Sequence, residues 1–397
     1  MLPARPRLTP AIADVRRAVR EALADLGDPD RRSSDGEPDR RSSSAAPQHV
    51  SRSDPGSEAG FRYAASSGYS TREIASTGEV SSTGEVSSAG EVPSTGGDLV
   101  LVALSGGPDS LALAAALAFE APRAGLRAGA VIVDHHLQAG STEVAQRAAA
   151  QARELGLDPV VILDAQVGTE GGPEAAARAA RYRELDAAAE QLRAAAVLLG
   201  HTLDDQAETV LLGLARGSGP ASLSGMRAAV GRYRRPLLGI RRSVTEQCCQ
   251  DSGLQPWHDP HNDDGTFTRV RVRNEVLPLL ERELGPGVTE ALARTAEQLR
   301  EDAEALDHFA EEVAEDLAEH TEAGIALPVR ALEVQPAALR QRLIRLAVAA
   351  EFHHALSRQH TLEVARLVTD WNGQGPLHLP GISVERRDGL LHFRARE

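Results

Sequence analysis

Short apolar runs alternate with helical patterns between residues 98 and 216, and few folds accommodate such an order. Strands are expected at 99–104, 130–133, 160–163 and 197–199, and helices at 109–119, 141–155, 173–192 and 204–216. Such alternation is typical of an α/β fold, a parallel sheet with helices on both faces. Ligands bind such sheets at the carboxyl ends of the strands. Polar residues at those ends are therefore the first candidates for a functional site.

The first strand is followed by a loop that suits a phosphate group. The loop comprises Ser105, Gly106, Gly107, Pro108, Asp109 and Ser110, and a helix begins within it. Backbone N–H groups of the glycines and of the helix N-terminus can approach a phosphate, and the serines add hydroxyl donors. Phosphates repel Asp109 unless a cation lies between them, so the loop predicts Mg²⁺. A plain strand-to-helix turn, with Ser and Gly as cap and bend, is the alternative interpretation.

Composition excludes several classes of chemistry. All 43 basic residues are arginines, which rules out Schiff-base lysines and the lysine of a Walker-type phosphate loop. Cys248 and Cys249 are adjacent, so no C-x-x-C pair is present for redox, zinc or iron–sulfur chemistry. No apolar run approaches the roughly 18 residues of a membrane span, and we expect a cytoplasmic protein without membrane contact. The net charge of −14 argues against a general nucleic-acid coat.

A second polar cluster follows the fourth expected strand. His201, Asp205 and Glu208 are four and three residues apart, so they share one face where a helix begins. His201 could bind phosphate or act as an acid or base, and Asp205 could hold a metal or the nucleophile. Helix capping and complementation of the helix dipole are the alternative. One cap accounts for one acid, however, and not for a histidine with Asp204, Asp205 and Glu208.

Arginines without acidic neighbours in the sequence predict a surface that binds nucleic-acid phosphates. Residues 209–245 contain no Asp or Glu, and after the loop 257–262 more arginines follow. Arginines of this kind contact the phosphate backbone of nucleic acids. A solvated face is the alternative interpretation. The candidates in these two stretches are Arg234, Arg235, Arg241, Arg242, Arg269, Arg271 and Arg273.

Composition also divides the chain into five parts. We expect an N-terminal helix in 1–27, a disordered low-complexity insertion at 28–97, a catalytic domain at 98–245, an Arg-rich loop and acidic helix at 246–327, and a small C-terminal α+β unit at 328–397. The acidic helix carries a seam of Leu, Ala and Val spaced three and four apart. The seam pairs two copies in a homodimer or packs within the same chain, and its many alanines favour the second.

Several motifs resemble known families. The S-G-G-x-D-S loop resembles the signature of the PP-loop ATP pyrophosphatases, which cut ATP between its α- and β-phosphates. The ordered set of motifs across residues 98 to 280 resembles the tRNA(Ile)-lysidine synthases. These motifs are 133–137, 177–182, 200–219, 223–226, 235–238 and 259–262. The chain departs from the family pattern at Val270, where Asn is frequent, and at His261, where Ser is frequent.

The resemblance implies a reaction and its participants. L-Lysine is ligated to C2 of the wobble cytidine of tRNA(Ile) with a CAU anticodon, through an adenylated tRNA, with AMP and pyrophosphate as products. ATP is expected at 105–110 and at Asp134, and Mg²⁺ at Asp109 and Asp205. Catalysis is assigned to Asp109, His201, Asp205 and Glu208, and further contacts with tRNA to Arg178 and Arg181.

Two other functions remain open at this point. Another PP-loop enzyme, such as a tRNA thiolase, would need catalytic cysteines at C-x-x-C spacing, and the sequence lacks them. A non-catalytic RNA-binding protein would catalyse no exchange between ATP and pyrophosphate.

Overall fold

The computed structural model describes residues 8–26, 97–136, 140–168, 172–217, 219–317, 319–321 and 324–396. The expected insertion at 28–97 lies outside the described residues except for Gly97. The described chain forms two compact units, one up to Arg300 and one from Glu301 onward. No described helix has the length and apolar character needed to cross a membrane.

The first unit is built on a six-stranded sheet with the order β3-β2-β1-β4-β6-β5. The strands are β1 (Leu99–Ala103), β2 (Arg127–Asp134), β3 (Val160–Asp164), β4 (Ala194–Leu198), β5 (Ala229–Val230) and β6 (Tyr233–Arg234). Neighbouring strands from β3 to β6 pair in parallel, and β5 pairs antiparallel with β6. The predicted α/β class is confirmed. β2 and β4 begin three residues before their predicted starts, because Ala and Gly give little strand signal in a sequence.

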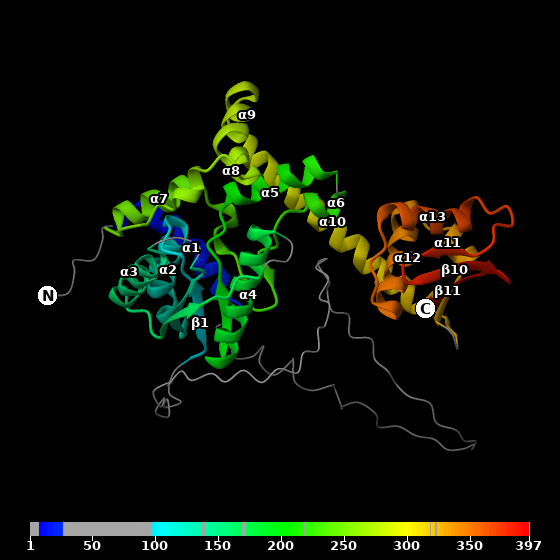
Figure 1. Cartoon of the computed structure of the whole chain (residues 1–397), viewed down its shortest axis with the longest axis horizontal. Helices are drawn as coiled ribbons and strands as arrows, with labels where there is room; N and C mark the ends of the chain where they lie inside the picture. The colour runs from blue at the N-terminus through cyan, green and yellow to red at the C-terminus, as the bar shows by residue number, and fades with distance from the viewer. Residues whose placement is uncertain are drawn as a thin grey trace, which may run out of the picture. The chain divides into compact units, whose positions relative to one another are not determined.

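Helices cover both faces of this sheet (Figure 1). On one face lie α1 (Pro10–Leu23), α2 (Pro108–Glu120), α3 (Ser141–Glu154) and α7 (Arg242–Asp251), and on the other lies α4 (Pro173–Gln191). Alternate residues of β1 enter the two cores: Val100 and Val102 face the α2 side, and Leu101 faces the α4 side. The N-terminal helix begins at Pro10, where the Thr9 hydroxyl accepts a hydrogen bond from the Ile12 N–H.

Shorter elements complete the first unit. They are η2 (Ala121–Ala124), α5 (Leu203–Arg216), α6 (Pro220–Leu223), η3 (Pro236–Gly239), η4 (Pro260–Asp263), α8 (Thr268–Arg271), the π-helical η5 (Val272–Val276) and α9 (Leu277–Leu284). The long helix α10 (Val288–Leu317) begins here. Its residues Ala296 and Leu292 pack within this unit, the latter against Ala207 and Val272.

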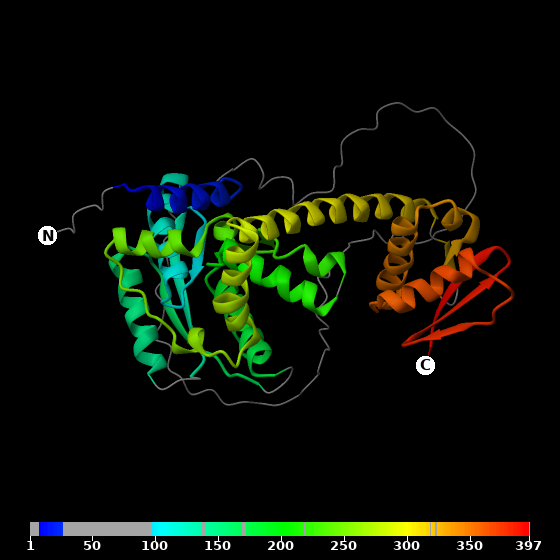
Figure 2. The ribbon, with the colours of Figure 1, turned by 90° about the horizontal axis from the view of Figure 1, so that it is seen from above.

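The second unit is an antiparallel sheet covered by helices (Figure 2). Its strands are β7 (Glu319–Thr321), β8 (Gly324–Pro328), β9 (Leu377–Leu379), β10 (Ile382–Arg387) and β11 (Leu390–Ala395), in the order β7-β8-β11-β10-β9, and its helices are α11 (Val329–Glu333), α12 (Ala337–Phe352) and α13 (Arg358–Thr369). Ala310 of α10 is buried in this unit's core, so seam residues pack within the same chain. The homodimer stays a prediction.

Candidate active site

The phosphate loop between β1 and α2 is braced by its own serines. The Ser110 hydroxyl donates to the Gly107 carbonyl at 3.0 Å, and the Ser105 N–H donates to Ser110 Oγ at 3.2 Å. Gly106 has a φ of +83°, a conformation that favours glycine. The N-cap of α2 is Gly107, which has no side chain to cap the helix. The first N–H groups of α2 are therefore available to an anion.

Gly200, at the end of β4, approaches this loop closely. A Cβ atom at Gly200 would lie 3.1 Å from the Ser110 nitrogen and 3.2 Å from the Asp109 carbonyl carbon. Both are backbone atoms, so they cannot yield by a rotamer change.

We therefore expect Gly200→Ala to displace the loop and weaken ATP binding by roughly 10–100-fold, because a lost hydrogen bond to a charged group costs about 1.5–3 kcal/mol. Nucleotide titration checks this. Gly239→Ala is the matched control, since a Cβ there would meet nothing within 4 Å. Equal ATP affinity of Gly200→Ala and the wild type would contradict the prediction.

A cavity of about 790 Å³ opens at the carboxyl ends of the strands. Most predicted nucleotide-binding residues line it: Ser105, Gly107, Pro108, Asp109, Ser110 and Asp134. His201 and Asp205 also line it, as do Arg181, Arg242 and Arg273. The segment from Trp257 to Asp263 lines it too, fixed to the phosphate loop by the Trp257 N–H, which donates to the Gly106 carbonyl at 2.9 Å. The structure thus brings the two predicted polar clusters together, while the roles of their residues stay predictions.

Asp205 and Glu208 are surrounded by three arginines. Glu208, whose side chain is fully buried, accepts from Arg269 Nε at 2.7 Å and from Arg273 Nε at 2.6 Å. Asp205 Oδ1 lies 3.0 Å from Arg242, 3.4 Å from Arg269 and 3.3 Å from Arg273. The other oxygen of Asp205 accepts from the N–H and hydroxyl of Thr202, which closes the cap of α5. Asp205 therefore both caps α5 and lines the cavity.

Asp109 is held by the first turn of α7. Arg242 Nε donates to Asp109 Oδ2 at 3.3 Å, and the Thr245 hydroxyl donates to Asp109 Oδ1. The Arg242 N–H donates to Asp204 Oδ2 at 2.7 Å, which attaches the same turn to α5. Sequence reasoning missed Thr245, because an isolated threonine inside a helical stretch carries no signal.

Burial and neighbouring charges shift the pKa values of Asp109, Asp205 and His201 in different directions. Burial raises the pKa of Asp109 in spite of Arg242 and Thr245. Burial would also raise the pKa of Asp205, but Arg242 and Arg269 outweigh it and hold that pKa below its usual range. Burial lowers the pKa of His201 well below 6.5, and Arg181 adds to this effect. His201 is therefore neutral at pH 7.

Three buried side-chain nitrogens of residues that line the cavity have no hydrogen-bond partner among the described residues. They are Nδ1 of His135, Nδ1 of His201 and Nε of Arg181. Buried polar atoms in proteins are normally paired. These three nitrogens are therefore candidate contacts for a bound molecule.

Asp134, at the end of β2, has both of its oxygens engaged. It accepts from the His136 N–H and from the Thr142 hydroxyl, each at 3.0 Å. Burial alone would raise its pKa, but these hydrogen bonds lower it on balance. His136 in turn contacts Asp164 on β3 at 2.8 Å. Asp134 thus organises the cavity wall, and its predicted ATP contact stays a prediction.

The arginines predicted to bind RNA fall into different surroundings. Arg242, Arg269 and Arg273 neutralise the acids at the cavity, although 61 residues separate Arg269 from Glu208 along the chain. The others pair elsewhere: Arg234 with the Gly231 carbonyl, Arg235 with the Arg227 carbonyl, Arg241 with Asp204 and Glu290, Arg271 with the Gly265 carbonyl, and Arg178 with the Tyr182 hydroxyl. The lack of acidic residues near these arginines in the sequence therefore did not show that several of them pair with acids in the folded structure.

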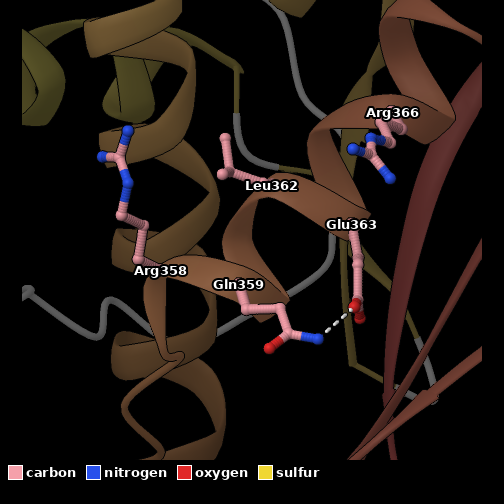
Figure 3. Close-up of a pocket in the computed structure, with 5 residues that line it drawn as sticks. All are labelled: Arg358, Gln359, Leu362, Glu363 and Arg366. Atoms are coloured by element: carbon pink, nitrogen blue, oxygen red, sulfur yellow. Dashed lines mark hydrogen bonds between the residues drawn. The ribbon is translucent and has the colours of Figure 1, made fainter.

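A second hollow, of about 510 Å³, lies in the C-terminal unit (Figure 3). It is lined by residues of α13 alone, namely Arg358, Gln359, Leu362, Glu363 and Arg366. Gln359 donates a hydrogen bond to Glu363 at 3.0 Å across this face. None of the predicted site residues lies there.

Comparison with known proteins agrees with the fold. Residues 85–280 match the model of the PP-loop domain, and residues 327–392 match that of the TilS substrate binding domain. The sheet, the phosphate loop and the first match together define a PP-loop ATP-binding protein.

Curated relatives are similar over most of the chain. The tRNA(Ile)-lysidine synthase of Leifsonia xyli is 64% identical over 75% of this chain and 90% of its own length. Those of Thermobifida fusca and Streptomyces coelicolor are each 55% identical, over 74% and 73% of this chain and 91% and 83% of their own lengths. The chain belongs to the tRNA(Ile)-lysidine synthase family, which confirms the predicted resemblance and an ATP-dependent ligase.

Proposed function

We propose that the chain ligates L-lysine to C2 of the wobble cytidine in tRNA(Ile) with a CAU anticodon, through an adenylated tRNA, releasing pyrophosphate and AMP. The observation that carries this proposal is the cavity in which the phosphate loop meets Asp109, His201 and Asp205. Membership of the family supports this reaction, and the cavity is the site at which we propose that it takes place.

Nucleotide binding comes first in this scheme. The triphosphate lies on the N–H groups at the start of α2 and on the hydroxyls of Ser105 and Ser110. The C2 oxygen of the cytidine attacks the α-phosphorus, and the bond to the bridging oxygen of pyrophosphate breaks. Arg181 reaches the same cavity and provides a positive charge for the phosphates or the wobble nucleotide.

Asp109 and Asp205 fit a magnesium ion. Both carboxylates line the cavity, and hard oxygen ligands are those that Mg²⁺ prefers. Arg242 already places a positive charge between them, at 3.3 and 3.0 Å. When bound, Mg²⁺ would neutralise the phosphates and make pyrophosphate a better leaving group.

In the second step the ε-amine of lysine attacks C2 of the cytidine, and the bond between C2 and the oxygen of AMP breaks. The ε-ammonium must first bind to a carboxylate and lose a proton. Asp205 lines the cavity, whereas Glu208 is fully buried behind three arginines. We therefore assign the ammonium contact to Asp205 and a supporting role to Glu208. The neutral His201, with its unpartnered Nδ1, orients a substrate by hydrogen bonding and does not supply a cation.

The cysteines do not favour a thiolase. Cys248 and Cys249 are both buried, and the Cys249 thiol donates to the Pro108 carbonyl at 3.3 Å. Burial raises the pKa of Cys249 to about 12, so this thiol is not the thiolate that sulfur transfer requires.

Incorporation of labelled lysine into tRNA(Ile), with and without ATP, tests the proposed function. We expect ATP-dependent label in the tRNA together with release of pyrophosphate. A thiolase would leave the tRNA without lysine, and a non-catalytic RNA-binding protein would release no pyrophosphate.

The arginines allow a test of tRNA docking that is separate from chemistry. If Arg234 contacts a phosphate, Arg234→Ala should weaken tRNA binding and reduce the slope of log K against log[salt] by roughly 0.7–0.9. Filter binding at several salt concentrations measures this slope. Arg273→Ala is the contrasting variant: because Arg273 pairs with buried Glu208, it should melt earlier with an unchanged slope. A wild-type slope in Arg234→Ala would place the tRNA surface elsewhere.

A further inference from the structure

Arg242 contacts three acids with one guanidinium group. Its Nε lies 3.3 Å from Asp109 Oδ2, one terminal nitrogen lies 3.0 Å from Asp205 Oδ1, and the other lies 3.5 Å from Glu208 Oε1. A planar guanidinium can satisfy several carboxylates in this way, whereas a compact cation with a single centre needs them to converge.

The neighbouring arginines Arg269 and Arg273 have a different set of ion-pair partners from Arg242. Arg269 and Arg273 pair with Asp205 and Glu208, while the ion pairs of Arg242 also include Asp109. Arg242 is thus the arginine that joins the phosphate loop to the acids of α5. It is also the cation between the two carboxylates that we propose for Mg²⁺.

The start of α7 is fixed independently of the Arg242 side chain. The Arg242 N–H is bound to Asp204 at 2.7 Å, and the Thr245 hydroxyl is bound to Asp109. The guanidinium lines the cavity with the phosphate loop. It can therefore move toward phosphates by rotation of its own side chain, without a shift of the helix.

We propose that Arg242 is a displaceable counter-ion. Before nucleotide binds, its guanidinium neutralises Asp109 and Asp205; when Mg²⁺ binds to these two carboxylates, the guanidinium moves to the triphosphate. This inference rests on the proposed function. The exchange keeps charge balanced, because the arriving dication replaces the guanidinium at the carboxylates and the guanidinium then faces the anionic phosphates. Metal and ATP should consequently bind with positive coupling, which is reciprocal by linkage.

The test uses Mn²⁺ as the probe, because free Mn²⁺ is measured directly by electron paramagnetic resonance. Without nucleotide, Arg242→Gln should bind Mn²⁺ about tenfold more tightly than the wild type, because the competing cation is gone. The preference of the same variant for ATP over AMP should fall by about the same factor, since the β- and γ-phosphates lose a partner. Arg241→Gln, which removes the neighbouring charge paired with Asp204 and Glu290, should leave Mn²⁺ affinity unchanged.

A second variant keeps the proposal testable if Arg242→Gln does not fold. Arg242→Lys retains the charge but places it on a single nitrogen, which spans less of the space between Asp109 and Asp205 than the guanidinium does. Its Mn²⁺ affinity should therefore lie between those of the wild type and Arg242→Gln. Wild-type Mn²⁺ affinity in every folded Arg242 variant would overturn the inference, as would an unchanged preference for ATP over AMP. Failure of the wild type to transfer lysine to tRNA would instead overturn the proposed function, whatever the Mn²⁺ result.

Discussion

Asp109→Asn should slow pyrophosphate release by on the order of 10²–10³-fold, the range seen when one electrostatic contact to a reacting group is removed. The substitution keeps the shape of the side chain and an oxygen for the Thr245 hydroxyl but removes the negative charge beside the phosphate loop. The affinity for tRNA should not change, because the carboxylate lies among the phosphate-loop residues and Arg242. Single-turnover assays of pyrophosphate release and filter binding of tRNA measure the two quantities.

Glu143→Gln is the matched control for this prediction. Glu143 also lies in the first turn of a helix on the same face of the sheet, but it does not line the cavity. Near-normal pyrophosphate release by Asp109→Asn would show that the charge of Asp109 has no part in adenylation.

Glu208→Gln should destabilise the protein by about 3–5 kcal/mol, as when one partner of a buried ion pair is removed. The carboxylate is fully buried and balances Arg242, Arg269 and Arg273, which would be left facing one another. Urea denaturation measures the change in the free energy of unfolding.

The exposed pair between Glu190 and Arg232 provides the comparison. Glu190→Gln should change stability by less than about 1 kcal/mol, because solvent screens this pair. If the two variants unfold at the same urea concentration, the arginine cluster does not depend on Glu208.

The sequence predicts most of the first unit because its strands are short apolar runs and the segments between them have helical patterns. The expected helices at 141–155 and 173–192 match α3 and α4 to within one residue at each end. The hairpin of β5 and β6 was missed, since two-residue strands such as Tyr233–Arg234 have no period to detect. Strand β10 was missed because Glu385, Arg386 and Arg387 hide the alternation of its buried residues Ile382 and Val384.

The candidate site was predictable where its residues are close in the sequence. The phosphate loop and the cluster from His201 to Glu208 each form a local motif. Because both follow strands of a parallel sheet, they were expected to lie together at the carboxyl ends of these strands. The partners of these acids could not be found this way. Arg242 and Arg273 come from helices whose placement depends on tertiary packing, and an arginine in a sequence looks the same whether it will meet a phosphate or a buried glutamate.

The N-terminal helix α1 has a consequence for how the protein tolerates cleavage. It buries Ile12, Val15, Val19 and Leu23 in the core of the first unit, and the Thr9 hydroxyl donates to Asp251 at the far end of α7. A protease cut between residues 27 and 96 would leave α1 held by these contacts and by the ion pair of Arg20 with Glu120 on α2. Burial of each of these aliphatic side chains contributes about 1.5–3 kcal/mol to the binding of α1 to the rest of the first unit. In such a nicked molecule α1 would be a peptide ligand of the larger fragment, so the two pieces expressed separately should assemble into a working enzyme.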